Sequence, residues 1–276
     1  MASSTVPEPD YSYLGLILST GDPRTRDWPM MGSPVIVVSI LASYLYFCTS
    51  LGPRLMKNRE AFNIRPIVLA YNVIMVGLSL FFCVLTLKLT YVGQEIGPYN
   101  VVCEATSTTD SVLLYWGWWY MLTKIGELLD TVFFVFLKKN SHISFLHLLH
   151  HSLALGTVWM DINNGITGQV AMFPILNAAV HVVMYGYYGL AALPSSVKPN
   201  LWWKKYVTQF QIAQFFALMV HGLMPFIFDC GFPKTMASLM VLEAGLFTCL
   251  FSDFYYKNYI KGQDERYIIG SSTKSD

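Results

Sequence analysis

The chain has 276 residues, of which 54% are hydrophobic and only 13% charged, and its mean hydropathy is positive. This apolar fraction exceeds that of an ordinary soluble domain and indicates an integral membrane protein. The formal net charge is only +1 and the sequence has no long run of Lys or Arg, so nucleic acid is not an expected partner. The first residues do not resemble a cleaved signal peptide.

Seven apolar runs follow one another along the chain, and each approaches the roughly 20 residues that a helix needs to cross a bilayer. The strand alternation of a membrane barrel is absent, so the sequence predicts an all-α membrane protein. We expect one integral-membrane domain over residues 1–276, with 1–33 and 258–276 as tails. The predicted spans are 34–53, 66–90, 112–137, 143–161, 168–192, 206–228 and 235–257.

The Lys and Arg residues gather in alternate connections between these spans. The positive-inside rule makes those connections cytosolic, which places the N-terminus in the lumen and the C-terminus in the cytosol. An odd number of spans fits this orientation. The residues on the predicted cytosolic side are Arg54, Lys57, Arg59, Arg65, Lys138, Lys139, Lys198, Lys204, Lys205, Lys257, Lys261, Arg266 and Lys274.

Two of the five cysteines, Cys103 and Cys230, fall in predicted lumenal connections. An oxidising lumen permits a disulfide between them. The sequence does not give the distance between the two sulfurs, so a disulfide and two separate thiols are both open.

The fourth predicted span contains "HLLHH", in which His147, His150 and His151 recur at i, i+3 and i+4 and therefore share one helix face. An ionisable residue inside a span costs on the order of 3 kcal/mol, so such residues usually satisfy one another or line a cavity. Packing alone seldom needs three imidazoles. The pattern therefore indicates a functional site.

The predicted topology places polar residues of three further spans at a similar depth, in the cytosolic half of the membrane. A purely structural explanation stays open for some of them: Lys124 could form an ion pair with Glu127 or Asp130, and the glutamines could join helices. These residues are Lys124, Glu127, Asp130, Thr131, Asn177, His181, Tyr185, Tyr188, Gln211 and Gln214.

Clustered histidines serve two kinds of chemistry. Diiron membrane desaturases and hydroxylases bind iron through histidine boxes, but six histidines in the whole chain are too few for two irons unless carboxylates substitute. The second kind is nucleophilic and acid–base catalysis, because a neutral imidazole attacks thioesters and a second imidazole can move the proton.

The sequence also resembles the very-long-chain fatty acid elongases of the endoplasmic reticulum, through four motifs in order. Lys124, Glu127, Asp130 and Thr131 fit KxxExxDT, and His147, His150 and His151 fit HxxHH; His181, Met184, Tyr185, Tyr187 and Tyr188 fit HxxMYxYY, and Thr208, Gln211 and Gln214 fit TxxQxxQ.

This resemblance implies seven transmembrane helices, six of them around a narrow acyl tunnel, in a multi-pass protein of the endoplasmic reticulum membrane. It implies an acyltransferase, a very-long-chain 3-oxoacyl-CoA synthase, which condenses an acyl-CoA with malonyl-CoA and releases carbon dioxide and CoA. No metal or other cofactor is expected. The expected partners are long-chain acyl-CoA, malonyl-CoA and membrane lipid; a homo-oligomer and the other enzymes of the elongation cycle are further candidates.

The resemblance also suggests roles for the motif residues, with an acyl-imidazole intermediate on His150 or His151. The catalytic candidates are His147, His150, His151, His181, Asp130 and Glu127. The substrate-binding candidates are Lys124, Asn177, Tyr185, Tyr187, Tyr188, Gln211 and Gln214, with Lys138, Lys139, Lys204 and Lys205 for the phosphates of CoA. The rival functions are a diiron oxidase and a non-enzymatic seven-helix receptor or transporter.

Overall fold

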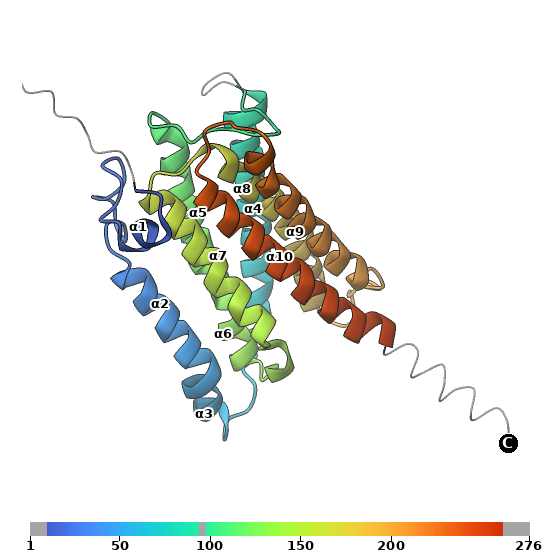
Figure 1. Ribbon diagram of the computed structural model, residues 1–276. Helices are drawn as coiled ribbons and strands as arrows, with labels where there is room; N and C mark the ends of the chain where they lie inside the picture. The colour runs from blue at the N-terminus through green and yellow to red at the C-terminus, as the bar shows by residue number, and fades with distance from the viewer. Residues whose placement is uncertain (1–9, 94–97, 262–276) are drawn as a thin grey trace, which may run out of the picture. The chain divides into compact units, whose positions relative to one another are not determined.

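The computed structural model describes residues 10–93 and 98–261 (Figure 1). These residues are helical with short connections, and they include no β-strand. They form two compact units, described separately below. Unit 1 comprises Met1–Phe62, Lys88–Ala171 and Met224–Leu239, and unit 2 comprises Asn63–Leu87, Met172–Leu223 and Met240–Asp276, each as far as it is described.

The elements up to residue 136 lie mostly within the predicted spans, except that α1 lies in the predicted tail 1–33 and that α5 and α6 divide the span 112–137. They are α1 (Tyr13–Leu18), α2 (Val35–Tyr46), the π-helix η1 (Phe47–Leu51), α3 (Gly52–Met56), α4 (Arg65–Leu87), the π-helix η2 (Lys88–Val92), α5 (Ser111–Glu127) and α6 (Leu129–Phe136).

The remaining elements complete the chain up to residue 261. They are the short 3-10 helix η3 (Asn140–His142), α7 (Phe145–Asn163), a second 3-10 helix η4 (Gly168–Ala171), α8 (Met172–Ala192), α9 (Lys204–Ile227), α10 (Lys234–Tyr255) and the π-helix η5 (Tyr256–Lys261).

Five helical segments among the described residues are long and apolar enough to cross a membrane. They are Val35–Met56, Arg65–Val92, Gly168–Ala192, Lys204–Ile227 and Lys234–Lys261. The protein is therefore an all-α, multi-pass membrane protein. The other two predicted spans correspond to α5 with α6 and to α7, so the count of seven stays a prediction. These helices carry Lys124, Glu127, Asp130 and the HLLHH histidines, which lower their hydropathy.

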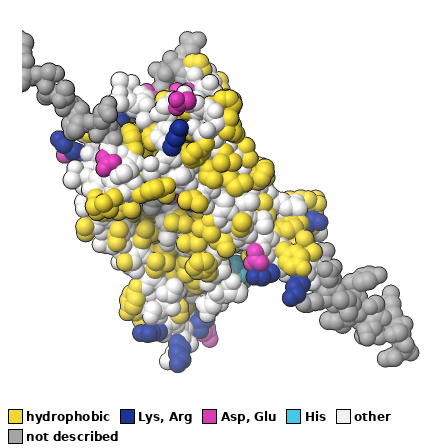
Figure 2. Space-filling model, in the orientation of Figure 1, with side chains coloured by type: hydrophobic (Ala, Val, Ile, Leu, Met, Phe, Trp, Pro, Cys, Tyr) yellow, Lys and Arg dark blue, Asp and Glu magenta, His cyan; other side chains and the backbone are white. Residues whose placement is uncertain are grey.

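The apolar residues of the long helices are largely on the surface, as a lipid environment requires. On α4, for example, Ile67, Val73 and Ile74 are each more than half exposed. Hydrophobic side chains cover much of the face that Figure 2 shows.

The segment before α2 is folded rather than a loose tail in its described part. In unit 1, the Asp22 and Gly32 backbone N–H groups donate to the backbone oxygen and Oδ1 of Asn163, at 2.7 and 2.8 Å. The Thr25 hydroxyl donates to the carbonyl oxygen of Ile162 at 2.9 Å. The last carbonyls of a helix lack partners within the helix, so this segment stabilises the C-terminal end of α7.

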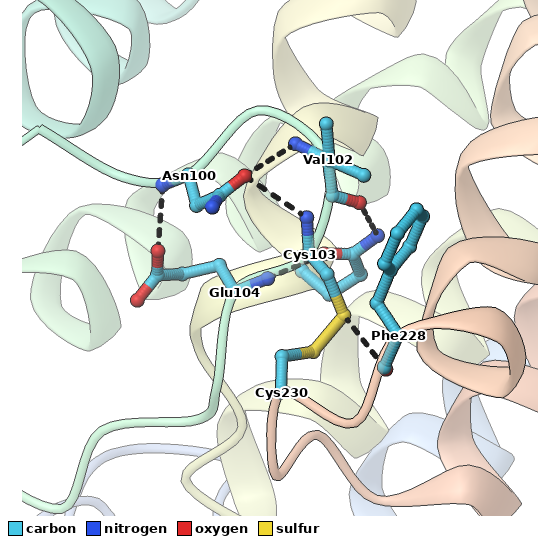
Figure 3. Close-up of a disulfide and its surroundings, with 7 residues drawn as sticks. Asn100, Val102, Cys103, Glu104, Phe228 and Cys230 are labelled. Atoms are coloured by element: carbon cyan, nitrogen blue, oxygen red, sulfur yellow. Dashed lines mark hydrogen bonds between the residues drawn. A yellow bond between two sulfur atoms is a disulfide. The ribbon is translucent and has the colours of Figure 1, made fainter.

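The loops after η2 and α9 are joined covalently in unit 1. Cys103 and Cys230 form a disulfide with a Cα–Cα distance of 5.8 Å (Figure 3). The Asn100 side-chain oxygen accepts hydrogen bonds from the backbone of Val102 and Cys103, and Gln169 donates to the carbonyl of Val102 at 3.2 Å. The disulfide thus lies in a hydrogen-bonded loop cluster.

In unit 2, α8 packs closely on α4, and α9 packs on α10. Met75, Met184, Tyr185 and Val207 form a buried cluster, in which Tyr185 is fully buried. On the other pair of helices, the Phe215 ring lies 5.2 Å from the Phe247 ring. These contacts fix the positions of α8 and α9, which carry two of the four motifs.

Candidate active site

The KxxExxDT motif lies across a break between two helices. The α5 helix ends at Glu127 and α6 begins at Leu129. The Leu128 N–H donates to the Ile125 carbonyl at 3.2 Å, an i to i−3 bond that tightens the chain into a 3-10 turn. As a result, Lys124 and Glu127 occupy the last turn of α5, and Asp130 and Thr131 the first turn of α6. A continuous predicted span at 112–137 gave no sign of this break.

Lys124 and Glu127 form a buried ion pair. The distance from Lys124 Nζ to Glu127 Oε1 is 2.7 Å, and the two side chains are only 2% and 3% exposed. The ammonium also lies 4.7 Å from the ring centre of Tyr120. Of the two ion pairs that the sequence left open, the structure shows Lys124 with Glu127 in direct contact. Asp130, three residues after Glu127 and in the first turn of α6, is also buried.

The histidines of HxxHH occupy the first two turns of α7. The hydroxyl of Ser144, the N-cap residue, accepts a hydrogen bond from the His147 backbone N–H at 3.2 Å, which fixes where the helix begins. The rings of His147 and His151 are 4.4 Å apart between centroids and nearly perpendicular, and the His150 ring is 5.7 Å from His151. The helical spacing thus brings three imidazoles into one cluster.

The two motifs of unit 1 meet at Thr131. Its hydroxyl oxygen lies 2.9 Å from His147 Nε2 and 2.8 Å from the hydroxyl of Tyr44 on α2. Thr131 is fully buried and Tyr44 is 6% exposed. Tyr44 is not among the residues predicted for the site, since one tyrosine in an apolar span carries no recognisable signal.

The third motif lies in unit 2, on one face of α8. Asn177, His181 and Tyr185 are all buried. The Asn177 side-chain nitrogen and His181 Nε2 are 3.5 Å apart, at the long limit of a hydrogen bond, and the rings of His181 and Tyr185 meet edge to face at 5.5 Å. Tyr187 packs against Trp203, whereas Tyr188 is 38% exposed.

The fourth motif lies on α9 of the same unit. Thr208 and Gln214 are buried and Gln211 is half-buried. The Gln211 side-chain nitrogen lies 3.5 Å from the sulfur of Met184, which joins the third motif to the fourth. The buried Gln214 Nε2 has no hydrogen-bond partner within residues 10–93 and 98–261.

The four lysines predicted to bind CoA phosphates lie at the ends of helices or beside them. Lys138 and Lys139 follow α6 and are exposed, as is Lys204 at the start of α9. Lys205 is half-buried, with its ammonium 5.1 Å from the ring centre of Tyr206. Arg266 and Lys274, also predicted on this side, lie outside the described residues.

No three His, Cys, Asp or Glu side chains are arranged to hold a metal ion in the described part of the chain. The predicted site residues thus fall into two groups, one in each unit. The first combines imidazoles, a hydroxyl pair and a buried ion pair. The second combines imidazole, phenol and amide groups, which are hydrogen-bond donors.

Comparisons with known proteins agree with the motifs. Residues 29–266 match the model of the ELO family, described as the GNS1/SUR4 family. The chain is 37% identical to very long chain fatty acid elongase 7 of Rattus norvegicus, over 89% of this chain and 88% of that protein. It is 36% identical to elongase 1 of Mus musculus, over 90% and 89% of the two chains, and 37% identical to elongase 4 of Homo sapiens, over 87% and 76%.

The match extends over almost the whole described chain, and it includes all four motifs. The resemblance to elongases drawn from those motifs is therefore confirmed. The chain belongs to the ELO (GNS1/SUR4) family of very long chain fatty acid elongases.

Proposed function

We propose that this protein catalyses the condensation step of fatty acid elongation. An acyl-CoA and malonyl-CoA react to give a 3-oxoacyl-CoA that is two carbons longer, together with carbon dioxide and CoA. The observation that carries the proposal is the cluster of His147, His150 and His151 on α7, with centroid distances of 4.4 and 5.7 Å between neighbouring rings. Family membership supports the choice of substrates.

In the first half-reaction, a ring nitrogen of His150 or His151 attacks the thioester carbon. The carbon–sulfur bond breaks, CoA leaves as thiolate, and an acyl-imidazole remains. The ring proton lost from the attacking imidazole passes to a neighbouring imidazole, which protonates the thiolate. Neighbouring rings are needed for this transfer, and the His151 ring has both other rings as neighbours, at 4.4 and 5.7 Å between centroids.

In the second half-reaction, malonyl-CoA loses carbon dioxide, and the electron pair of the broken carbon–carbon bond forms an enolate. The enolate carbon attacks the acyl carbon, and the carbon–nitrogen bond breaks to restore the imidazole, which takes up one proton from solvent. Asn177, His181 and Gln211 are our candidates to donate hydrogen bonds to the developing oxyanions. The predicted topology places Gln211 near the depth of the histidines, and Asn177 and His181 between that layer and the middle of the membrane.

The remaining candidates bind or orient. Asp130 and Glu127 are our candidates to orient and tune the attacking histidine, in the manner of a base oriented by a third residue. Lys138, Lys139, Lys204 and Lys205 attract the phosphates of CoA. Lys124 stays a substrate-binding candidate, and its ammonium lies 2.7 Å from the carboxylate of Glu127.

The decisive experiment separates a covalent from a direct mechanism. Purified protein is incubated with a long-chain acyl-CoA alone, and peptides are mapped by mass spectrometry. We expect an acyl adduct on the peptide that contains His150 and His151, release of CoA before malonyl-CoA is added, and ping-pong kinetics. A ternary-complex rate law without an adduct would show that histidine acts only as a base.

The same preparation tests the rival functions. A diiron oxidase contains bound iron and consumes oxygen, whereas the proposed condensation is unchanged by a strong iron chelator. A receptor or transporter keeps its function in His150→Ala, whereas the proposed enzyme loses condensation activity. Release of labelled carbon dioxide from malonyl-CoA reports the reaction directly.

We further propose that the protein resides in the endoplasmic reticulum membrane with a lumenal N-terminus and a cytosolic C-terminus. The distribution of Lys and Arg supports this orientation. In sealed microsomes, a C-terminal tag is expected to be accessible to protease and an N-terminal tag protected. The reverse pattern would contradict the orientation.

A further inference from the structure

Three side chains from three separate elements of unit 1 form a continuous hydrogen-bonded chain. Tyr44 on α2 meets Thr131 on α6, with 2.8 Å between their hydroxyl oxygens, and Thr131 meets His147 on α7, with 2.9 Å from Oγ1 to Nε2. These residues are 87 and 16 positions apart in sequence, so the chain exists only in the folded protein.

The chain suits an imidazole whose protonation state changes. A hydroxyl both donates and accepts, whereas each nitrogen of a neutral imidazole does one or the other. When His147 Nε2 accepts, Tyr44 donates to Thr131 and Thr131 donates to His147. When Nε2 carries a proton, both hydroxyls rotate and the direction reverses. The Nε2 atom of His147 is thereby hydrogen-bonded in either protonation state without movement of the ring.

Burial excludes water from this hydrogen-bonded chain. Thr131 is fully buried and Tyr44 is 6% exposed, so solvent does not replace either partner. A tyrosine hydroxyl in an apolar helix is costly to bury unless it is hydrogen-bonded. A phenylalanine would fill nearly the same volume without that cost. The hydroxyl of Tyr44 therefore contributes its hydrogen bond to Thr131 rather than packing volume.

We propose that Tyr44 is a positioning residue for the histidine cluster: through Thr131 it holds the ring of His147 in place against the ring of His151. This inference rests on the proposed function, because it assigns to His147 a proton-accepting part in acyl transfer. Tyr44 does not itself contact the reacting atoms. Its loss lets the Thr131 hydroxyl rotate, and the edge of the His147 ring then loses its fixed orientation.

The primary test is Tyr44→Phe, with Tyr46→Phe as the matched control. Tyr46 lies on the same helix but is 57% exposed. We expect kcat for condensation to fall about five- to tenfold in Tyr44→Phe, the range of one net hydrogen bond, with KM for both substrates unchanged. Tyr46→Phe keeps the kcat of the wild type. A wild-type kcat in Tyr44→Phe would overturn the proposal.

Variants of Thr131 show whether the effect passes through its hydroxyl. Thr131→Val removes the link and is expected to lower kcat at least as far as Tyr44→Phe, whereas Thr131→Ser retains most of the turnover. The double variant Tyr44→Phe/Thr131→Val is expected to match Thr131→Val alone, because the chain is already broken. If kcat in the double variant falls by the product of the two single-variant factors, Tyr44 acts independently of Thr131 and the proposal is wrong.

A spectroscopic measurement separates this inference from the proposed function. Ring-nitrogen NMR signals of 15N-labelled histidine are recorded for the same proteins, and the His147 signals are assigned from their absence in His147→Gln. Tyr44→Phe is expected to shift them and Tyr46→Phe to leave them in place. If wild-type protein does not condense the two substrates, the proposed function fails, and these spectra still decide whether Tyr44 positions His147.

Discussion

Thr131 and His147 are hydrogen-bonded at 2.9 Å although they lie on different helices, α6 and α7. This contact joins the KxxExxDT motif to the HxxHH motif. It depends on the 3-10 turn at Leu128, which ends α5 and begins α6 directly before Asp130 and Thr131. The break between the two helices is thus part of how the candidate site is built.

The buried ion pair of Lys124 and Glu127 is expected to be essential for stability. Glu127→Gln removes the carboxylate that pairs with the buried ammonium of Lys124, and breaking a buried ion pair costs about 3–5 kcal/mol. Thermal unfolding of the purified protein in detergent measures the effect.

An exposed ion pair of the same length is the control. The Lys257–Asp253 distance is also 2.7 Å, but these side chains are 65% and 54% exposed. Asp253→Asn is expected to cost less than about 1 kcal/mol. Equal losses in the two variants would mean that burial of the first pair has no energetic consequence.

The disulfide between Cys103 and Cys230 is expected to stabilise the folded protein strongly, because the two cysteines are 127 residues apart. In the chain-entropy model, a loop of this length corresponds to about 4–5 kcal/mol. Reduction, or Cys103→Ser with Cys230→Ser, should lower the unfolding temperature.

The free, exposed Cys249 supplies the comparison for that experiment. Cys249→Ser is expected to unfold at the temperature of the wild type and to remain sensitive to reductant. The double serine variant should no longer respond to reductant. A double variant whose unfolding temperature still falls on reduction would show that the effect does not come from this disulfide.

The lengths of the apolar runs predicted most of the long helices, because lipid-facing helices carry a strong compositional signal. The predicted span at 66–90 corresponds to α4 at Arg65–Leu87, and the span at 206–228 to α9 at Lys204–Ile227. The i, i+3, i+4 spacing also predicted that the three histidines of α7 lie close together, as their ring distances show. These features depend on residues that are near one another in sequence.

The Cys103–Cys230 disulfide was one of two alternatives that the sequence left open, but the hydrogen bonds between distant residues were not predicted. The segment containing Asp22 and Gly32 has a polar composition typical of a tail, and its order comes from its bonds to Asn163 at the end of α7. Tyr44 acquires its significance only through Thr131, 87 positions later. Such long-range hydrogen bonds cannot be recognised from the local sequence.

The exposed lysine at the start of α9 is expected to contribute to CoA binding. Lys204→Glu should raise KM for acyl-CoA several-fold and leave kcat almost unchanged, because the phosphates lie far from the reacting carbonyl. The effect should weaken as salt is added, since exposed charges are screened. Lys198→Glu, at another exposed lysine in the preceding loop, is the control. Equal increases in KM for the two variants would point to general surface charge instead.

The ion pair of Asp22 and Arg24 should make the stability of the N-terminal segment depend on pH. The guanidinium donates to both carboxylate oxygens of Asp22, at 2.8 and 3.0 Å, and also to the carbonyl of Gly165. Burial by itself raises the pKa of Asp22, but the hydrogen bonds from Arg24 and its positive charge outweigh burial and hold the pKa below its ordinary value.

A lowered carboxyl pKa stabilises the folded state only while the carboxylate is ionised. This stabilisation is fully present above the ordinary aspartate pKa of about 3.9 and is lost as the pH falls through the lower folded-state pKa. Asp22→Asn should therefore unfold at a lower temperature than the wild type at pH 7 and pH 5, and the gap should close below about pH 4. The exposed residue Asp27 is the control, and Asp27→Asn should change the unfolding temperature little at either pH. A gap between Asp22→Asn and the wild type that widens on acidification would contradict the sign of the pKa shift and, with it, the assignment of Arg24 as the group that holds Asp22 ionised.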